Sequence, residues 1–229
     1  RRWAQSNWQV SWRRLGKSEK GPEKNAPYQK ADFETEEAQK VRIVGGKHKG
    51  RTLQAPAGRD VRPTSDRARE GIFNILAHSI DWQGFEDVAV LDVFSGTGAL
   101  GLEAISRGAS SGVFIDNDPT SLQCVKTNAA TLGEARNILT LKLDARRLFQ
   151  PPRAAQAPLS LAFLDPPYGT KLSDQALLGL CHKGWIAPGG LVVVEISKDD
   201  ELILPRGFSV LDERTYGAAQ VTFLKFKGT

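Results

Sequence analysis

The sequence predicts an α/β fold in which a mostly parallel β-sheet is covered by helices on both faces. Three observations predict it. Apolar segments of strand length alternate with helical segments from Val88 onward, a glycine-rich turn follows the first of these strands, and two strands near the end form a hairpin. Strands that are almost continuous apolar runs are typical of parallel sheets buried on both sides. The 229 residues, 40% of them hydrophobic, suffice for one such domain with an appendage.

Residues 1–40 have a composition unlike the rest of the chain. Lys, Glu, Gln, Asn and Pro dominate and no hydrophobic period is sustained, which predicts a disordered, basic tail. Residues 1–15 carry Trp3, Trp8 and Trp12 and no acidic residue. An organellar targeting stretch, an RNA-binding arm and a short packed helix are therefore all open interpretations of this segment.

Residues 41–84 predict an extension made of a β-hairpin followed by a helix. Val41–Leu53 has the pattern of the hairpin, with Gly45-Gly46 supplying the positive φ of a tight turn. The polar positions of the hairpin are nearly all basic: Arg42, Lys47, Lys49 and Arg51. The helix is expected to begin where Thr64 or Ser65 can cap it. Its apolar face consists of Ala68, Ile72, Phe73, Ile75 and Leu76.

Residues 85–229 predict the α/β domain itself. Parallel strands are expected at Val88–Phe94, Gly112–Asp116, Ile138–Leu143, Leu159–Leu164 and Leu191–Ile196. Helices are expected at Ala99–Arg107, Pro119–Leu132 and Ser173–Lys183, with a short turn near Ala145–Phe149. Phe208–Thr215 and Gln220–Phe226 are separated by only four residues, so they predict a hairpin in which one strand runs against the others.

The charge and cysteine content narrow the class of protein. Lys and Arg number 31 against 26 Asp and Glu, and this net charge of +5 suits a nucleic-acid partner as well as an ordinary soluble protein. Two cysteines and three histidines lack the spacing of a metal site or a disulfide framework, so we expect no metal. No apolar run approaches the roughly 20 residues of a membrane span, so no membrane association is expected.

The first strand ends in a glycine-rich loop that indicates a nucleotide-containing ligand. The predicted strand ends with Asp92 and Phe94, Gly96 and Gly98 follow before the next helix, and Gly101 completes the pattern G-x-G-x-x-G. Asp116 closes the second strand and can accept both ribose hydroxyls, and Asn117 beside it belongs to the same predicted set. The alternative role of a capping acid suits Asp118 better, because it precedes Pro119 at the first helical position.

A third acid, Asp144, closes the third strand. Asp144 could accept a hydrogen bond from an adenine amino group while the Ala145 N–H donates to the ring. The alternative is that Asp144 only caps the short turn that follows it.

Asp165-Pro166-Pro167-Tyr168 follows the buried strand Leu159–Leu164 and predicts the reacting end of the site. Two consecutive prolines force the chain into a stiff, extended exit. A carboxylate from Asp165 and a carbonyl from Pro166 can accept both hydrogens of a planar amine, and the Tyr168 ring can stack on the base that carries it. The alternative is an ordinary strand-to-loop turn.

Together these motifs resemble the class I S-adenosylmethionine-dependent methyltransferases. That resemblance implies a Rossmann-like, seven-stranded sheet with a reversed last strand and S-adenosylmethionine as the cofactor. A dehydrogenase that binds NAD would share the glycines but would have no use for Asp-Pro-Pro-Tyr. More narrowly, the chain from about Val41 to Phe226 is similar to the RsmD family, through the hairpin residues Arg42–Arg51, the stretch Arg62-Pro-Thr-x-Asp-Arg67-x-Arg69-Glu70 and Phe73-Asn74.

The resemblance to the RsmD family implies methylation of the N2 amine of a guanine in bacterial small-subunit (16S) ribosomal RNA. It implies catalytic roles for Asp165, Pro166, Pro167 and Tyr168, and RNA contacts for Arg42, Lys47, Lys49, Arg51, Arg62, Arg67 and Arg69. The implied partner is ribosomal RNA or a small-subunit assembly particle. We expect the protein to be a monomer and to act in the cytoplasm.

Three other functions stay open. A DNA adenine-N6 methyltransferase also uses Asp-Pro-Pro-Tyr, but the segment after Asp165 is too short for a separate target-recognition region. A protein glutamine methyltransferase would prefer Asn at position 165. A non-enzymatic RNA-binding assembly protein would not need a cofactor pocket, so cofactor binding distinguishes it from an enzyme.

Overall fold

The computed structural model describes residues 41–55 and 65–228. The tail predicted for residues 1–40 and the predicted RNA contact Arg62 lie outside this part of the chain. The strands of the described part are β1 (Val41–Arg42), β2 (Thr52–Leu53), β3 (Ala89–Val93), β4 (Ser111–Asp116), β5 (Ile138–Lys142), β6 (Leu159–Leu164), β7 (Ile186–Ser197), β8 (Phe208–Tyr216) and β9 (Ala219–Phe226). Its α-helices are α1 (Asp66–His78), α2 (Ala99–Ser106), α3 (Pro119–Leu132) and α4 (Leu172–His182). Three 3-10 helices are η1 (Gly46–His48), η2 (Ala145–Arg147) and η3 (Arg153–Ala155).

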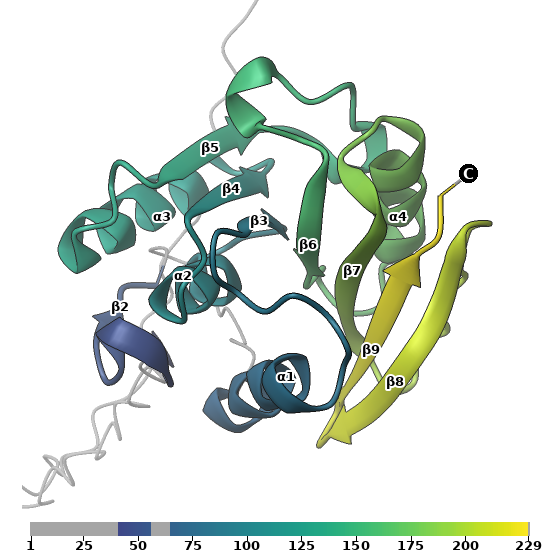
Figure 1. Ribbon diagram of the computed structural model, residues 1–229, viewed down its shortest axis with the longest axis horizontal. Helices are drawn as coiled ribbons and strands as arrows, with labels where there is room; N and C mark the ends of the chain where they lie inside the picture. The colour runs from purple at the N-terminus through teal and green to yellow at the C-terminus, as the bar shows by residue number, and fades with distance from the viewer. Residues whose placement is uncertain (1–40, 56–64, 229) are drawn as a thin grey trace, which may run out of the picture. The chain divides into compact units, whose positions relative to one another are not determined.

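Seven of the described strands form one sheet in the order β5-β4-β3-β6-β7-β9-β8, which runs from left to right in Figure 1. The strands β3 to β7 pair in parallel, whereas β9 is antiparallel to both of its neighbours, β7 and β8. The predicted α/β class, the parallel core and the reversed last strand are therefore confirmed.

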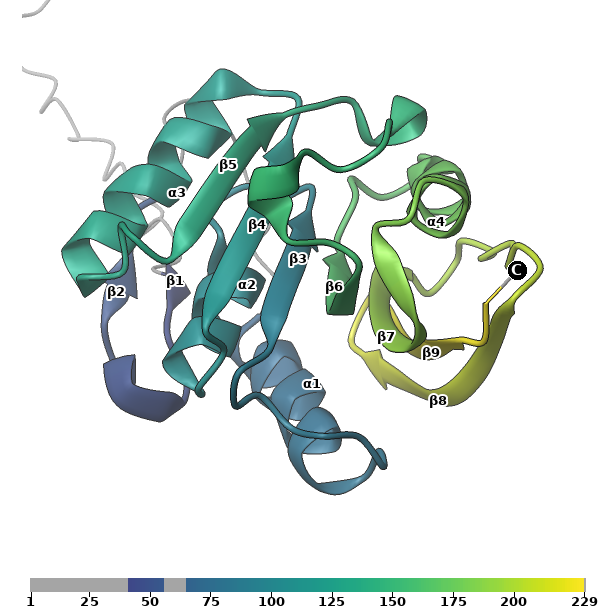
Figure 2. The same ribbon diagram turned by 45° about the horizontal axis from the view of Figure 1, so that its top comes forward.

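Helices cover both faces of this sheet, as Figure 2 shows from a second direction. On one face α1, α2 and α3 contribute Ile72, Leu102 and Val125 to a core that also contains Phe163 of β6. On the other face α4 contributes Leu177 to a second core. Alternation along a strand sends successive side chains to opposite faces, and the apolar run of β6 supplies both cores.

Caps at the helix ends follow the local sequence. Ser65 is the N-cap of α1 and accepts a hydrogen bond from the Ala68 N–H at 3.1 Å, which confirms Ser65 as one of the two predicted caps. Asp118 caps α3 in the same way, before Pro119 at its first position. Gly133 ends α3 with a left-handed φ of 81°, a conformation that glycine adopts at little cost.

The N-terminal hairpin differs from the tight turn that its two glycines predicted. Gly46 has the expected positive φ of 73°, but Gly45 is extended and the strands are joined through η1. The reason is contact with α2: Ser106 donates to the Gly45 carbonyl and accepts from the His48 N–H, and a side chain at Gly46 would overlap the Ser106 carbonyl. The turn is therefore shaped by its docking surface. The predicted domain boundary after residue 84 stays a prediction.

Strand β7 begins at Ile186 rather than at Leu191, where the prediction placed it. The added residues include Pro188, Gly189 and Gly190, which are poor strand formers and hid the extension from a reading of the sequence. Ile186 pairs with Leu159, and the register between β6 and β7 then shifts before Leu161 meets Leu191. The irregular register explains how a strand can run through these residues.

Candidate functional site

The predicted site residues leave the sheet at the carboxyl ends of three neighbouring strands. Val93 of β3 lies opposite Ile115 of β4 and Leu164 of β6. The next residues along each strand are Phe94, Asp116 and Asp165, so the register brings the three predicted segments to one edge. Ligands of open α/β sheets bind at this edge.

The loop after β3 is held in a conformation that suits a ligand approaching its backbone. Gly96 and Gly98 have positive φ values of 50° and 78°, and Phe94 has 65°, which is costly for a residue with a Cβ. The Ser95 N–H donates to the Ile115 carbonyl at 3.1 Å, which anchors the loop to β4. A side chain at Gly101 would overlap the ring of Phe114, so the third glycine serves the packing of α2 on the sheet.

Asp116 lies at the end of β4 with both carboxylate oxygens bound to backbone. Oδ2 accepts from the Gly96 N–H at 3.0 Å and Oδ1 accepts from the Asp118 N–H at 2.9 Å. Each oxygen keeps a second lone pair, so the carboxylate can still accept from a diol. Asn117, the next residue, is exposed.

Asp92 is placed beneath the loop rather than on it. Its side chain is buried, with the residue 2% exposed, and Oδ2 accepts from the Gly101 N–H at 2.9 Å. Burial raises the pKa of Asp92 to about 8, opposed by the Gly101 hydrogen bond and reinforced by the charge of Asp116. Asp92 therefore supports the conformation of the glycine loop through Gly101, and its predicted contact with a cofactor stays a prediction.

Asp144 ends the connection after β5 and performs the capping role that was its alternative interpretation. Its carboxylate accepts from the Arg146 N–H at 3.0 Å and pairs with the Arg146 guanidinium at 2.7 Å. This arginine holds the pKa of Asp144 at about 2, so the group is ionised at neutral pH. Ala145 is buried beside it. A ligand contact by Asp144 remains a prediction.

These groups fit a nucleoside cofactor. The Ser95 hydroxyl is buried and has no hydrogen-bond partner among the residues that the structure describes, so a polar ligand could satisfy it. The backbone is open to approach at Gly96, where a Cβ would meet no atom closer than 3.9 Å, whereas Gly98 packs against the core. The ionised Asp144 and the oriented Asp116 supply acceptors at the ends of the two next strands. Within the described residues no group of three metal-ligating side chains was found.

The Asp-Pro-Pro-Tyr segment follows β6 without a break. Asp165 is half-buried, Pro166 is buried, and Pro167 and Tyr168 are exposed, with Tyr168 39% accessible. The Tyr168 hydroxyl donates to Glu195 Oε1 at 2.9 Å. A pocket lies beside this segment, lined by Pro166, Pro167, Tyr168, Gly169, Thr170, Lys171, Ser173, Asp174, Ile196, Asp200, Glu201 and Leu202.

Glu195 lies beside the candidate site and was not among the residues predicted from the sequence. It lies on β7, is 4% exposed, and is next to Val194, which pairs with Leu164 of β6. The register therefore brings Glu195 beside Asp165. The available signal was a single acid inside the otherwise apolar run Leu191–Ile196. A charge at a buried strand position requires a partner or a function.

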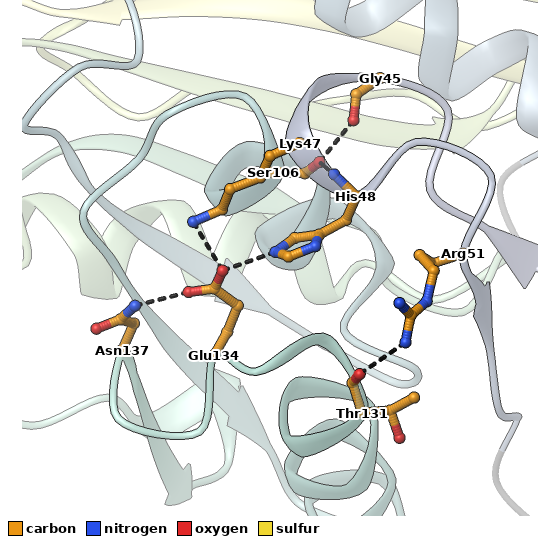
Figure 3. Close-up of polar contacts among 8 residues, drawn as sticks. All are labelled: Gly45, Lys47, His48, Arg51, Ser106, Thr131, Glu134 and Asn137. Atoms are coloured by element: carbon orange, nitrogen blue, oxygen red, sulfur yellow. Dashed lines mark hydrogen bonds and ion pairs between the residues drawn. The ribbon is translucent and has the colours of Figure 1, made fainter.

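The basic hairpin contacts the α/β domain through two of the residues that were predicted to contact RNA, Lys47 and Arg51 (Figure 3). Lys47 Nζ and His48 Nε2 each lie 2.7 Å from Glu134 Oε1, and the Asn137 side chain donates to Glu134 Oε2 at 2.6 Å. Arg51 points to another partner, the Thr131 carbonyl at 2.9 Å. Arg51 therefore joins the hairpin to the last turn of α3, and Lys47 joins it to the α3–β5 connection.

The burial of Arg69 contradicts the prediction that it contacts RNA. It is 1% exposed, its guanidinium donates to the Arg42 carbonyl, and it forms an ion pair with Asp66. Arg42 also pairs with Asp66, although its side chain stays largely exposed. Lys49 and Arg67 are exposed and remain candidates for RNA contact.

Comparison with known proteins gives a consistent picture. The family described as "Conserved hypothetical protein 95" matches residues 41–225. The ribosomal RNA small subunit methyltransferase D of Haemophilus influenzae is 38% identical over 77% of this chain and 89% of its own length. The protein of the same name from Escherichia coli is 35% identical over 77% of this chain and 85% of its own length.

Solved structures agree with these relatives. The Escherichia coli protein yhhF, described as a candidate methyltransferase, superposes with a TM-score of 0.69 and 32% identity, over 83% of this chain and 99% of its own. TrmN from Thermus thermophilus, at 24% identity, 69% of this chain, 48% of its own and a TM-score of 0.55, shares the fold. Among the described residues no helix is both long and apolar enough to cross a membrane.

Proposed function

Because this chain belongs to the RsmD family, we propose that it methylates the N2 amine of a guanine in small-subunit ribosomal RNA, with S-adenosylmethionine as the methyl donor. One observation carries the proposal. The register of β3, β4 and β6 brings the glycine loop, Asp116 and Asp165-Pro-Pro-Tyr168 to the same edge of the sheet. A cofactor held by the first two segments would therefore face an amine held by the third.

The cofactor site is formed by the loop after β3 and by the ends of β4 and β5. Asp116 accepts the ribose hydroxyls, with its carboxylate already oriented by the Gly96 and Asp118 N–H groups. Asp144 and the Ala145 N–H contact the adenine edge. The bound cofactor supplies an electrophilic methyl group on a sulfonium.

The amine is held by the loop after β6. The Asp165 carboxylate and the Pro166 carbonyl accept hydrogen bonds from the two N–H groups of the amine, which directs the nitrogen lone pair toward the cofactor side of the site. The same carboxylate would stabilise the positive charge that develops on nitrogen while the N–C bond forms and the S–C bond of the donor breaks, and the nitrogen would then lose one hydrogen to solvent as a proton. Tyr168 stacks on the extruded base. Most of the acceleration then comes from holding two substrates in line.

Mass-spectrometric mapping of methylated nucleosides tests the proposal. Small-subunit ribosomal RNA incubated with protein and S-adenosylmethionine is expected to gain N2-methylguanosine at one position. Asp165→Ala should nearly abolish this product while leaving the fold and the cofactor affinity in place, and Asp165→Asn should be milder because its amide oxygen still accepts one hydrogen bond. Methylation of adenine instead, or turnover by Asp165→Ala close to that of the unmodified protein, would refute the assignment.

A further inference from the structure

The loop that follows β6 is held near its middle by the side chain of a buried acid. The Tyr168 hydroxyl donates to Glu195 Oε1 at 2.9 Å. Glu195 is 4% exposed, whereas Tyr168 is 39% exposed. The tip of the ring is therefore anchored below the surface while part of the ring remains accessible.

The position of Glu195 in β7 is unusual for a charge. Leu191 and Val193 belong to the core beneath α1, α2 and α3, and alternation places Glu195 on that same face. A carboxylate there loses its hydration, so it requires hydrogen-bond donors and positive charge around it. The Tyr168 hydroxyl is one such donor. Burial lowers the pKa of Arg69, and the charges of Asp66, Glu103 and Glu195 oppose that change, which places Glu195 within the field of a buried arginine.

A second acid holds the backbone of the same loop. Asp200, in the connection after β7, accepts from the Gly169 N–H at 2.9 Å. Gly169 has a left-handed φ of 71°, and Thr170 closes the turn by donating from Oγ1 to the Pro167 carbonyl at 2.5 Å. Tyr168 and Gly169, adjacent residues in the middle of the loop, are thus each bound to an acid on or just after β7.

We propose that Glu195 and Asp200 are positioning residues that hold the Asp-Pro-Pro-Tyr loop ready for the extruded base. Glu195 sets the plane of the Tyr168 ring, and Asp200 fixes the backbone next to it. This inference rests on the proposed function, in which Tyr168 stacks on the base. A ring that is already fixed loses less rotational freedom when a base binds, so the effect is expected in RNA affinity rather than in the chemical step.

Tyr168→Phe is the central test, because it keeps the ring and removes only the hydroxyl. If the ring merely stacked, this variant would be silent. If Glu195 positions the ring, the KM for RNA should rise by about three- to tenfold with kcat and the cofactor Kd unchanged. Tyr216→Phe is the matched control, since it removes a hydroxyl next to Gly71 of α1, outside the loop.

Variants of the two acids complete the test. Glu195→Gln keeps an acceptor for the Tyr168 hydroxyl and should change KM less than Glu195→Ala. Combining Tyr168→Phe with Glu195→Gln should raise KM no further than Tyr168→Phe alone, because both act through one hydrogen bond. Asp200→Ala should also raise the KM for RNA, whereas Asp200→Asn, which keeps an acceptor oxygen, should have a KM close to that of the unmodified protein. Thermal unfolding of each variant shows whether a rise in the KM for RNA accompanies a loss of folded structure.

The outcomes separate this inference from the proposed function. If Asp165→Ala abolishes methylation but Tyr168→Phe and Asp200→Ala leave the KM for RNA unchanged, the positioning role is wrong and the proposed function stands. If KM effects are additive in the double variant, Glu195 does not act through Tyr168. If Asp165→Ala is fully active, the proposed function itself fails.

Discussion

The carboxylate of Asp116 is held from two sides by backbone N–H groups, one from the glycine loop and one from the turn into α3. This arrangement fixes its orientation before any ligand binds. It also means that Asp116 supports the conformation of Gly96, so a substitution would act on the loop as well as on the ligand.

Asp116→Ala should weaken the binding of S-adenosylmethionine by about 1–3 kcal/mol, because ribose hydroxyls would lose their acceptor. Asp116→Asn keeps one acceptor oxygen and should lose less. Isothermal titration calorimetry measures both, and Asp81→Ala, after α1, controls for the loss of an exposed acid. Unchanged affinity in Asp116→Ala would rule out the ribose contact.

Asp92 should make the protein less stable as pH rises. Its folded pKa of about 8 lies above the ordinary value of 3.8, so the folded state holds a proton that the unfolded state releases. The free energy of unfolding therefore falls between about pH 4 and pH 8, by at most about 1.4 kcal/mol per pH unit, and levels off above that. Asp92→Asn still accepts from the Gly101 N–H but cannot ionise.

Urea unfolding at pH 5, 6, 7 and 8 measures this effect. The difference in unfolding free energy between Asp92→Asn and the unmodified protein should shift in favour of the variant as pH increases. A difference that stays constant across this range would show that Asp92 ionises with an ordinary pKa.

At the scale of elements, the N-terminal hairpin is joined to α2 and α3 by side chains as well as by its apolar residues. Glu103 of α2 accepts from the Val44 N–H at 2.7 Å, and Asn128 of α3 bonds both the N–H and the carbonyl of Gln54. Two strands of two residues each would have little stability alone. The hairpin therefore depends on the helices beneath it.

Glu134 is expected to stabilise this docking in a pH-dependent way. Although burial acts to raise its pKa, hydrogen bonds from Lys47, His48 and Asn137 hold it at about 2, below the ordinary 4.5. Its contribution is therefore fully present above about pH 4.5 and is lost as pH falls toward 2. Glu134→Gln should lower the free energy of unfolding by about 1–3 kcal/mol at pH 7 and by less at pH 3.

Chemical denaturation at the two pH values tests the role of Glu134, with the exposed Glu70→Gln on α1 as a control. Equal destabilisation by Glu134→Gln at pH 7 and pH 3 would mean that the charge of Glu134 does not hold the hairpin.

Basic residues of this region should divide into two groups by their response to substitution. Lys49→Ala and Arg67→Ala remove exposed charges, so each should reduce the salt dependence of RNA binding by about one unit of slope if it contacts a phosphate. Lys47→Ala should chiefly lower stability, since Lys47 pairs with Glu134. Fluorescence anisotropy with ribosomal RNA at several salt concentrations gives the slopes. A slope that is unchanged in both Lys49→Ala and Arg67→Ala would show that neither residue contacts a phosphate of the RNA.

For the molecule as a whole, the parallel core was predictable because each strand is an apolar run with its own helix or turn after it. Leu159–Leu164 and Pro119–Leu132 have the predicted bounds, since hydrophobic period and capping residues act locally. The three acids at strand ends were found for the same reason. Their actual ligand contacts stay predictions.

What the sequence could not predict depends on residues far apart in the chain. The burial of Arg69 requires Asp66 and the Arg42 carbonyl, and the pairing of Lys47 requires Glu134 on another element. Glu195 acquires a role only through its contact with Tyr168. From the sequence alone, a run of basic residues therefore predicted exposure to solvent or contact with RNA. The structure shows that some of these residues instead pair with acids far away in the sequence.

The hairpin's dependence on α2 and α3 has a consequence for the order of events during synthesis. Its hydrogen bonds to Glu103, Ser106 and Glu134 span 59, 58 and 86 residues of sequence. A nascent chain therefore carries the hairpin segment out of the ribosome well before its docking surface exists. The segment cannot form these contacts until α3 and the turn after it have been synthesised. Its amides should gain protection from hydrogen exchange together with those of α3, although it lies first in the described chain.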